Sequence, residues 1–349
     1  MPPSGRPPPD GHSSTPDESP TTRGFGESVG IGDLVVRCHY NLRVVRALLL
    51  TGHSGFAGCS VRSVIATDPH ACGWQVALLP ADLDIRSPEL AGAIAALHPD
   101  AVLHLAARTS VAESFRDPEG YFDVNVQGTW NLLRALRSAD FRGRFLYVGS
   151  GDCYGSVDEN ALPITESTPL RPRSPYAVSK AAAEALCYQW SQGGSFEIVL
   201  ARPFNQIGPG QDARFAVAAF AGQVARIRAG KAPPLLEVGD LDVTRDLTDV
   251  RDVVHAYLRL LDAGGNGTVY NVASGRETRI RDALETLLEL AGVHANVVVD
   301  PARLRPGEQR RAVADVTLIE RDTGWRATTP LAASLAAMLD DWSKRIQDE

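Results

Sequence analysis

Short apolar segments alternate with longer amphipathic segments through most of the chain, and this alternation restricts the fold more than any other feature. Apolar runs occupy residues 44–50, 76–79, 101–106, 144–148 and 197–202, and helical spacing fills residues 89–97, 121–136 and 176–190. Strands that are apolar on both faces and separated by helices are typical of a parallel sheet covered on both sides. The pattern therefore predicts an α/β fold with a doubly wound parallel sheet of the Rossmann type.

The rhythm becomes less regular after residue 203. Helices are predicted at 215–227, 253–261, 280–290 and 331–346, and short strands at 269–272 and 297–299. We interpret this region as a smaller α/β lobe that is partly interleaved with the sheet domain. The expected division assigns residues 44–203, with roughly 242–273, to a dinucleotide-binding domain, and residues 204–241 and 274–349 to a substrate-binding lobe.

The first 43 residues have a different composition. They begin MPPSGRPPPDGHSSTP and offer little that a core could bury, so a disordered extension is expected. This segment has neither the basic start nor the apolar stretch of an export signal. The chain's five cysteines are scattered without a CxxC pair, which fits a reduced, cytoplasmic protein without a metal site.

Charge and hydropathy exclude two classes of partner. A net charge of −7 gives no electrostatic reason to expect nucleic acid or an acidic membrane surface. No apolar run approaches the roughly 20 residues that a membrane-spanning helix needs. The hydrophobic fraction of 44% is ample for a packed core, so wholesale disorder is excluded as well.

A glycine cluster, TGHSGFAG at residues 51–58, follows the first predicted strand directly. Its GxxGxxG spacing before a helix suits a tight turn whose backbone N–H groups face a pyrophosphate. An acidic residue often ends the second strand of such domains and binds the adenosine ribose, but Pro80 stands there, so NADH and NADPH both stay open. Asp82 and Asp84 could accept a hydrogen bond from an adenine amino group or could lie in a solvated turn.

Tyr176 and Lys180 are four residues apart on a predicted helix, so they share one face. An ammonium group near a phenol lowers the phenol's pKa and prepares it for proton transfer to or from a carbonyl oxygen. A YxxxK pair alone is more often a surface pair. Here Ser150 stands at the end of the 144–148 strand, where a catalytic group is expected, and the order of glycine loop, serine and YxxxK favours an active site.

With these motifs in place, the chain resembles the extended short-chain dehydrogenases/reductases of the NAD-dependent epimerase/dehydratase family. The resemblance covers about residues 44–342 and is carried by TGHSGFAG, HLAA, NVQGT, SGDCYG, PYAVSK, ARPFNQIGPGQ and RPGE. The segments RPRSPYAVSK and LDVTRDLTDVRDVV are most similar to the GDP-6-deoxy-4-keto-mannose reductases, relatives of the GDP-mannose 4,6-dehydratases. Gln206 stands where relatives often have histidine, which leaves the substrate detail open.

The resemblance implies which residues bind ligands. It assigns the cofactor, NADPH or NADH, to Gly52, Gly55, Phe56, Gly58, Asp84, Ile85, Leu105, Ala106, Ala107, Asn125, Tyr176, Lys180 and Pro203. It assigns the substrate to Thr109, Asn205, Arg245, Arg305 and Glu308. Each of these arginines, taken singly, could instead form a surface ion pair. His104 is expected to be a hydrogen-bonded structural residue, and no metal is implied.

The implied reaction is reduction of the C4 ketone of a 4-keto-6-deoxy sugar nucleotide, from GDP-4-keto-6-deoxy-mannose to a GDP-6-deoxyhexose such as GDP-rhamnose. Tyr176 would supply the proton, Ser150 would stabilise the developing alkoxide, and Lys180 would lower the tyrosine pKa and bind the nicotinamide ribose.

Two alternatives stay open. Asp152 stands two residues after Ser150, where dehydratases of the group carry an acid used in water elimination, so a GDP-mannose 4,6-dehydratase or another nucleotide-sugar epimerase/dehydratase is the first. A non-catalytic NAD(P)-binding sensor is the second, and the intact Ser150, Tyr176 and Lys180 oppose it. By analogy with relatives, a homodimer would form through the 121–136 and 176–190 helices.

Overall fold

The computed structural model describes residues 45–71, 73–304, 309–347 and 349. The expected disordered extension, residues 1–43, lies outside this part of the chain.

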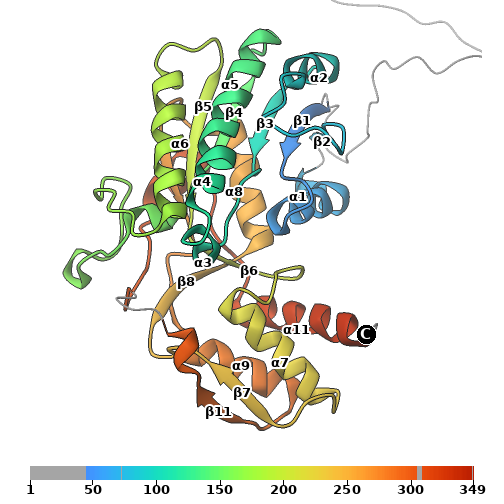
Figure 1. The fold of residues 1–349 in the computed structure, drawn as a ribbon, viewed down its shortest axis with the longest axis vertical. Coiled ribbons are helices and arrows are strands. Elements are labelled where there is room, and N and C mark those ends of the chain that lie inside the picture. Colours follow the sequence, from blue (N-terminus) through green and yellow to red (C-terminus); the bar gives the residue numbers. More distant parts are fainter. Residues whose placement is uncertain (1–44, 72, 305–308, 348) are drawn as a thin grey trace, which may run out of the picture. The chain divides into compact units, whose positions relative to one another are not determined.

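Within these residues, six parallel strands form the main sheet (Figure 1). Its order is β2-β1-β3-β4-β5-β9. The strands are β1 (Arg46–Thr51), β2 (Trp74–Ala77), β3 (Ala101–His104), β4 (Arg144–Val148), β5 (Glu197–Pro203) and β9 (Val269–Val272). The predicted parallel sheet is therefore confirmed.

Helices cover both faces of this sheet because successive strand residues point to opposite sides. Leu48 and Leu50 pack into one buried cluster, and Leu49 between them packs into another. The first cluster includes side chains from α1 (Phe56–Thr67), α8 (Val250–Ala263) and α10 (Thr317–Thr323). The second includes side chains from α2 (Leu90–Leu97), α5 (Gly128–Ser138) and α6 (Pro175–Ser191). The sheet is doubly wound, as the alternation predicts.

The strand order reverses direction at β1, since β2 lies on one side of β1 and β3 on the other. At such a switch point the connections leave in opposite directions and open a crevice at the carboxyl ends of the strands. The glycine loop follows β1, and Leu105–Ala107 follow β3, so both segments border this crevice. The topology thus places the predicted cofactor residues at the expected end of the sheet.

The remaining elements have a core of their own. In the described residues these elements form a three-stranded sheet, a parallel strand pair and three helices. These are β6 (Asn205–Ile207), β8 (Thr244–Asp249) and β10 (Glu277–Arg279), then β7 (Leu235–Val238) with β11 (Asn296–Val299), then α7 (Ala216–Arg228), α9 (Ile280–Ala291) and α11 (Leu331–Gln347).

We keep the division into two lobes as a proposal with two adjustments to its boundaries. Ile319 and Trp325 pack into the core of the main sheet, although the expected division places residues 274–349 in the second lobe. Strand β8 pairs with β6 and β10 of the second lobe, although the expected division places residues 242–273 in the dinucleotide-binding domain.

The helix predicted at 121–136 is interrupted. It consists of α4 (Pro118–Phe122), a π-helical turn (Asp123–Gln127) and α5, and a shorter helix, α3 (Val111–Ser114), precedes them. A π turn inserts one extra residue and often marks a functional position, and hydrophobic spacing could not show it. The second strand was also placed two residues late, because Leu78 and Leu79 continue the apolar run after β2 has ended. No helix in the described residues is both long and apolar enough to cross a membrane.

Candidate active site

The glycine loop is closed by contacts that only glycine permits. Gly52 has a φ of +70°, and a Cβ there would lie 2.6 Å from the Ala106 nitrogen. A Cβ on Gly58 would lie 2.2 Å from the Gly52 carbonyl oxygen. Gly55 differs, because its Cβ would meet only that same oxygen at an ordinary 3.5 Å. The fold thus requires Gly52 and Gly58, whereas Gly55 leaves open space beside the N-terminus of α1.

A chain of buried hydrogen bonds fixes the strand ends behind this loop. The Thr129 hydroxyl donates to the Asn125 carbonyl (2.6 Å), so it accepts from His104 Nε2 (3.0 Å). His104 Nδ1 is then left to accept from the Thr51 hydroxyl (2.8 Å), which itself accepts from the Ala106 N–H (3.2 Å). The expectation that His104 is a hydrogen-bonded structural residue is confirmed.

Because His104 is buried in its neutral form, we expect the protein to lose stability as the pH becomes acidic. Burial, assisted by the charge of Lys180, lowers the pKa of His104 to about 3. In the unfolded chain a histidine has a pKa of about 6.5, so between about pH 6.5 and about pH 3 the unfolded chain binds one more proton than the folded protein. The free energy of unfolding therefore falls as pH drops below about 6.5, by about 1.4 kcal/mol per pH unit. Urea unfolding at pH 7 and pH 5 should show a drop that is about 2 kcal/mol smaller for His104→Gln than for the native chain. Equal drops would contradict this prediction.

Three of the four candidate catalytic side chains, those of Ser150, Tyr176 and Lys180, are buried at the ends of β4 and α6, and Asp152 follows Ser150 by two residues. Ser150 follows β4 and accepts a hydrogen bond from the Asp152 N–H (3.1 Å), which fixes the start of a 3₁₀ helix at Gly151–Tyr154. Tyr176 lies in the first turn of α6, which Ser174 caps through the Ala177 N–H (3.1 Å). The Ser150 and Tyr176 side chains are both buried.

The pKa of Tyr176 differs from the expected direction. Burial raises it above the ordinary value, the negative charge of Asp152 raises it further, and the Ser150 hydrogen bond only partly offsets these effects. The lowering assigned to Lys180 does not set this pKa, because desolvation of a phenolate dominates in a buried site. Tyr176 therefore keeps its proton at neutral pH, as a proton donor requires.

Lys180 is buried one turn further along α6. Its Nζ lies 4.9 Å from the centre of the Tyr147 ring, and burial lowers its pKa to about 8. The chain has three lysines, at positions 180, 231 and 344, among 35 basic residues. A buried lysine titrates near neutral pH, whereas arginine does not. A lysine at this position of an arginine-rich chain therefore indicates that the site needs a cation whose pKa is close to neutral.

Asn125, in the π-helical turn, connects the catalytic helix to the loop after β3. Its Nδ2 donates to the Ser179 hydroxyl (2.9 Å), and that hydroxyl donates to the Tyr176 carbonyl (2.7 Å). Its Oδ1 accepts from the Arg108 backbone N–H (2.8 Å), and its Nδ2 also donates to the Arg108 carbonyl (3.1 Å). With both Nδ2 hydrogens and Oδ1 hydrogen-bonded, the Asn125 side chain holds the turn of Tyr176 in place.

The two residues assigned to adenine have protein partners of their own. Asp84 accepts from Arg86 through Nε (2.9 Å) and Nη2 (2.8 Å), and these bonds hold its pKa below the usual range. Ile85 is buried and packs so closely on α5 that a Cβ on Gly128 would lie 2.7 Å from its Cδ1.

The predicted substrate residues are spread over several loops. Thr109 and Asn205 are exposed, after β3 and at the start of β6, and Pro203 is buried at the end of β5. The Arg245 guanidinium donates to the Gln309 carbonyl (2.9 Å). Arg305 and Glu308 lie outside the described residues.

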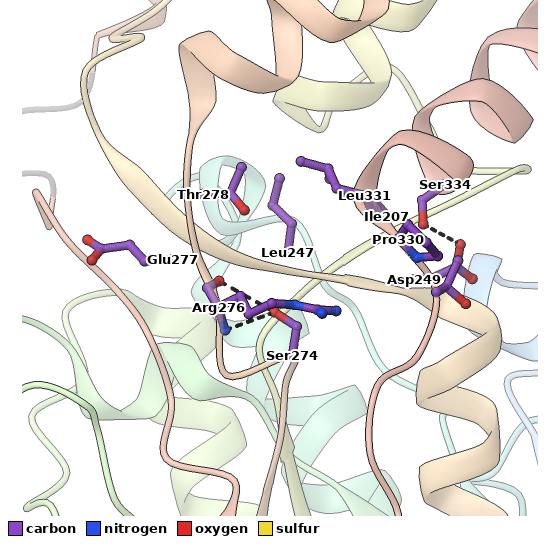
Figure 2. Close-up of a pocket in the computed structure, with 11 residues that line it drawn as sticks. Ile207, Leu247, Asp249, Ser274, Arg276, Glu277, Thr278, Pro330, Leu331 and Ser334 are labelled. Carbon is purple, nitrogen blue, oxygen red and sulfur yellow. Dashed lines mark hydrogen bonds between the residues drawn. The ribbon is translucent and has the colours of Figure 1, made fainter.

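Gln206 and a cavity lined by residues of the second lobe add little to the site. The Gln206 Nε2 reaches the hydroxyl of Tyr257 (3.3 Å), and its Oε1 is buried without a partner in the described residues. One cavity, of about 370 Å³, lies beside β8, β10 and the first turn of α11 (Figure 2). None of the predicted catalytic or cofactor residues lines it, and its Asp249 is bonded to Ser334 (2.6 Å) and Arg251.

The structure also brings in residues that the sequence analysis missed. Glu184, Arg202 and Tyr154 form a buried cluster beside Lys180. One signal was available, because Glu184 is the single charged residue in the otherwise apolar segment AAAEALC at 181–187. No group of three or more possible metal-binding side chains occurs in the part of the chain that the structure describes.

A parallel sheet with a glycine loop at its switch point and a buried Ser-Tyr-Lys set defines the class of extended short-chain dehydrogenases/reductases. Comparison with known proteins agrees. The family model described as GDP-mannose 4,6 dehydratase matches residues 61–338. A GDP-6-deoxy-D-mannose reductase of Pseudomonas aeruginosa is 46% identical over 88% of this chain and 100% of its own length. A UDP-glucose 4-epimerase of Mycolicibacterium smegmatis is 30% identical over 86% of this chain and 99% of its own.

Solved structures show the same relationship. The structure of RMD from Pseudomonas aeruginosa complexed with NADPH has a TM-score of 0.81 at 44% identity, covering 86% of this chain and 100% of that one. The Thermus thermophilus UDP-glucose 4-epimerase complex with NAD has a TM-score of 0.74 at 30% identity, covering 85% and 98%. The chain belongs to the GDP-mannose 4,6-dehydratase family of extended short-chain dehydrogenases/reductases.

Proposed function

We propose that the chain catalyses the NADPH-dependent reduction of the C4 ketone of a GDP-linked 4-keto-6-deoxy sugar, giving a GDP-6-deoxyhexose such as GDP-rhamnose. The observation that carries this proposal is the 46% identity, over the whole length of the relative, to a GDP-6-deoxy-D-mannose reductase. The buried Ser150, Tyr176 and Lys180 supply the groups that such a reduction needs.

The glycine loop fits a dinucleotide. The fold itself does not require glycine at position 55. A phosphate bound at the N-terminus of α1 does require glycine there, because a side chain would occupy the space that the phosphate needs. NADPH is preferred over NADH on two grounds. The solved relative was complexed with NADPH. In addition, Leu78, Leu79 and Pro80 follow β2, so no carboxylate there would repel a ribose phosphate.

Each catalytic side chain has one role in the proposed mechanism. The bound nicotinamide supplies a hydride to C4 of the sugar. Tyr176 donates its proton to the C4 oxygen as negative charge develops there, and Ser150 donates a hydrogen bond to the same oxygen. Lys180 holds its positive charge close to Tyr176 and binds the nicotinamide ribose. Asn125 and Ser179 keep the turn of Tyr176 in place.

Substrate anchoring is proposed for the second lobe and for Thr109, which follows β3 of the main sheet. Thr109 and Asn205 would bind the sugar or its phosphates, and Arg245, Arg305 and Glu308 the nucleotide. An acidic chain must bind two anionic ligands locally, through backbone N–H groups and a few arginines.

Asp152 separates the reductase from a dehydratase. In a dehydratase this carboxylate would take part in water elimination, and its loss would cost about 100-fold or more in rate. In a reductase it adds negative charge near Tyr176. We expect Asp152→Asn to keep reductase turnover within about tenfold of the native rate, measured by oxidation of NADPH with the 4-keto-6-deoxy GDP-sugar. A larger loss, together with turnover of GDP-mannose by the native chain, would favour the dehydratase.

The assay of the native chain tests the proposal itself. Consumption of NADPH with the 4-keto-6-deoxy GDP-sugar supports the reductase. Conversion of GDP-mannose without net change in the cofactor would mean a dehydratase. Tight cofactor binding without turnover of either sugar would mean a sensor.

We also propose that the enzyme works as a homodimer in the cytoplasm. Phe122, Trp130, Val178 and Tyr188, near or on α5 and α6, are between 38% and 51% exposed, an apolar set that a second copy would cover. Light scattering at micromolar concentration tests the dimer. The free cysteines in the described residues, Cys59, Cys153 and Cys187, fit a reducing compartment.

A further inference from the structure

A buried ion pair lies one helical turn beyond Lys180. Glu184 follows Lys180 by four residues on α6, so the two side chains lie on the same face. Arg202, on β5, binds both carboxylate oxygens of Glu184, through Nε (2.9 Å) and Nη2 (2.6 Å). Each of the two side chains is only 6% exposed. Burying two charges is costly, and the cost is recovered only with such complete pairing.

The pair extends into a network that reaches the Ser150 turn. Arg202 Nη1 donates to the Tyr154 hydroxyl (2.8 Å) and to the Glu166 carbonyl (3.3 Å). The Tyr154 hydroxyl donates in turn to Asn271 Oδ1 on β9 (2.7 Å). Tyr154 ends the 3₁₀ helix that begins directly after Ser150. The network therefore joins the helix that carries Tyr176 and Lys180 to the turn that carries Ser150.

Lys180 is surrounded by groups from four elements, and most of them are neutral. They are Cys153 in the 3₁₀ helix, Glu184 and Cys187 on α6, His104 on β3 and the Tyr147 ring on β4. Burial raises the pKa of Cys153 to about 12, raises that of Cys187 well above its ordinary value, and keeps His104 unprotonated. Glu184 is the acid among these groups that forms an ion pair, and Arg202 is its partner.

We propose that Glu184 and Arg202 are positioning residues of the active site, which together set the charge felt by Lys180 and hold α6 against the Ser150 turn. The proposal rests on the role assigned to Lys180 above. Glu184 stabilises the ammonium form of Lys180 against the effect of burial, and Arg202 limits that stabilisation.

The three lysines of the chain make this proposal directly measurable. Protein labelled with ¹³C at lysine Cε gives three lysine signals, and Lys180→Met identifies the signal of Lys180. Its pKa can then be read from an NMR pH titration without any substrate. Lys231 and Lys344 serve as internal references.

The two single variants should move the Lys180 pKa in opposite directions. Glu184→Gln removes the negative charge and should lower this pKa by about one unit. Arg202→Gln should raise it by a smaller amount, because the charge of Glu184 acts more strongly on Lys180. Arg202→Lys keeps the charge and should leave the pKa near its native value. A role confined to packing would give no shift, or shifts of the same sign, and that result would overturn the proposal.

Each single variant leaves one buried charge unpaired and can fail to fold. The double variant Glu184→Gln with Arg202→Gln avoids this, since no unpaired charge remains. It should lower the Lys180 pKa by less than Glu184→Gln does, because the charge with the stronger effect on Lys180 is the negative one. An unchanged pKa in the folded double variant would overturn the proposal.

A matched control is Glu197→Gln. It breaks the exposed pair of Glu197 with Arg144, at the start of β5, and should leave the Lys180 pKa unchanged. Because no readout here needs turnover, failure of the proposed reductase activity and failure of this inference are distinguished.

Discussion

Replacing Tyr176 by phenylalanine should abolish most turnover and leave the fold and the cofactor affinity close to native. The phenol is buried and keeps its proton because desolvation raises its pKa. It is the proposed proton donor to the C4 oxygen, and loss of such a donor typically costs about 100- to 10,000-fold in rate. The measurement is the rate of NADPH oxidation with saturating 4-keto-6-deoxy GDP-sugar.

Two companion measurements make this result specific. NADPH titration by fluorescence should show an affinity within a fewfold of native, because the ring and its packing on Tyr121 are kept. The phenylalanine also lacks the buried hydroxyl, so a small change in stability is expected. Native turnover in the Tyr176→Phe variant would remove the proposed mechanism, whatever the affinity.

The second large effect is expected at Gly58. A Cβ at this position would lie 2.2 Å from the Gly52 carbonyl oxygen and 2.7 Å from the His53 Cα, both backbone atoms of the loop. Gly58→Ala must therefore displace the loop that is proposed to face the pyrophosphate. Loss of one or two of its N–H contacts, each about 1.5 kcal/mol, should weaken NADPH binding by about 10- to 100-fold. Isothermal titration at fixed salt measures this loss.

Gly92 provides the matched control. It lies inside α2, and a Cβ there would meet nothing within 4 Å. Alanine is the better helix former by about 0.8–1.0 kcal/mol, so Gly92→Ala should leave NADPH affinity unchanged and slightly raise the melting temperature. If Gly58→Ala behaved in the same way, the loop would not be the cofactor site.

The local sequence contains enough to predict the main architecture. Alternating apolar and amphipathic segments are a property of neighbouring residues, and they predicted the doubly wound sheet and strand β4 at its observed bounds. Short strands such as β6 and β10 escaped prediction because three residues carry no measurable periodicity. Their existence depends on partners that are distant in the chain.

The sequence by itself determined the family, the glycine loop and the order Ser150, Tyr176, Lys180, because spacing on one helix or at one strand end is a local property. Only the tertiary structure decided the electrostatics. The expected lowering of the Tyr176 pKa did not follow from a YxxxK spacing, since burial and Asp152 act in the opposite direction. The ion pair of Glu184 with Arg202 joins α6 to β5 and is invisible to any local pattern. Burial and long-range charge depend on which segments pack together, and packing is fixed only when the whole chain is folded.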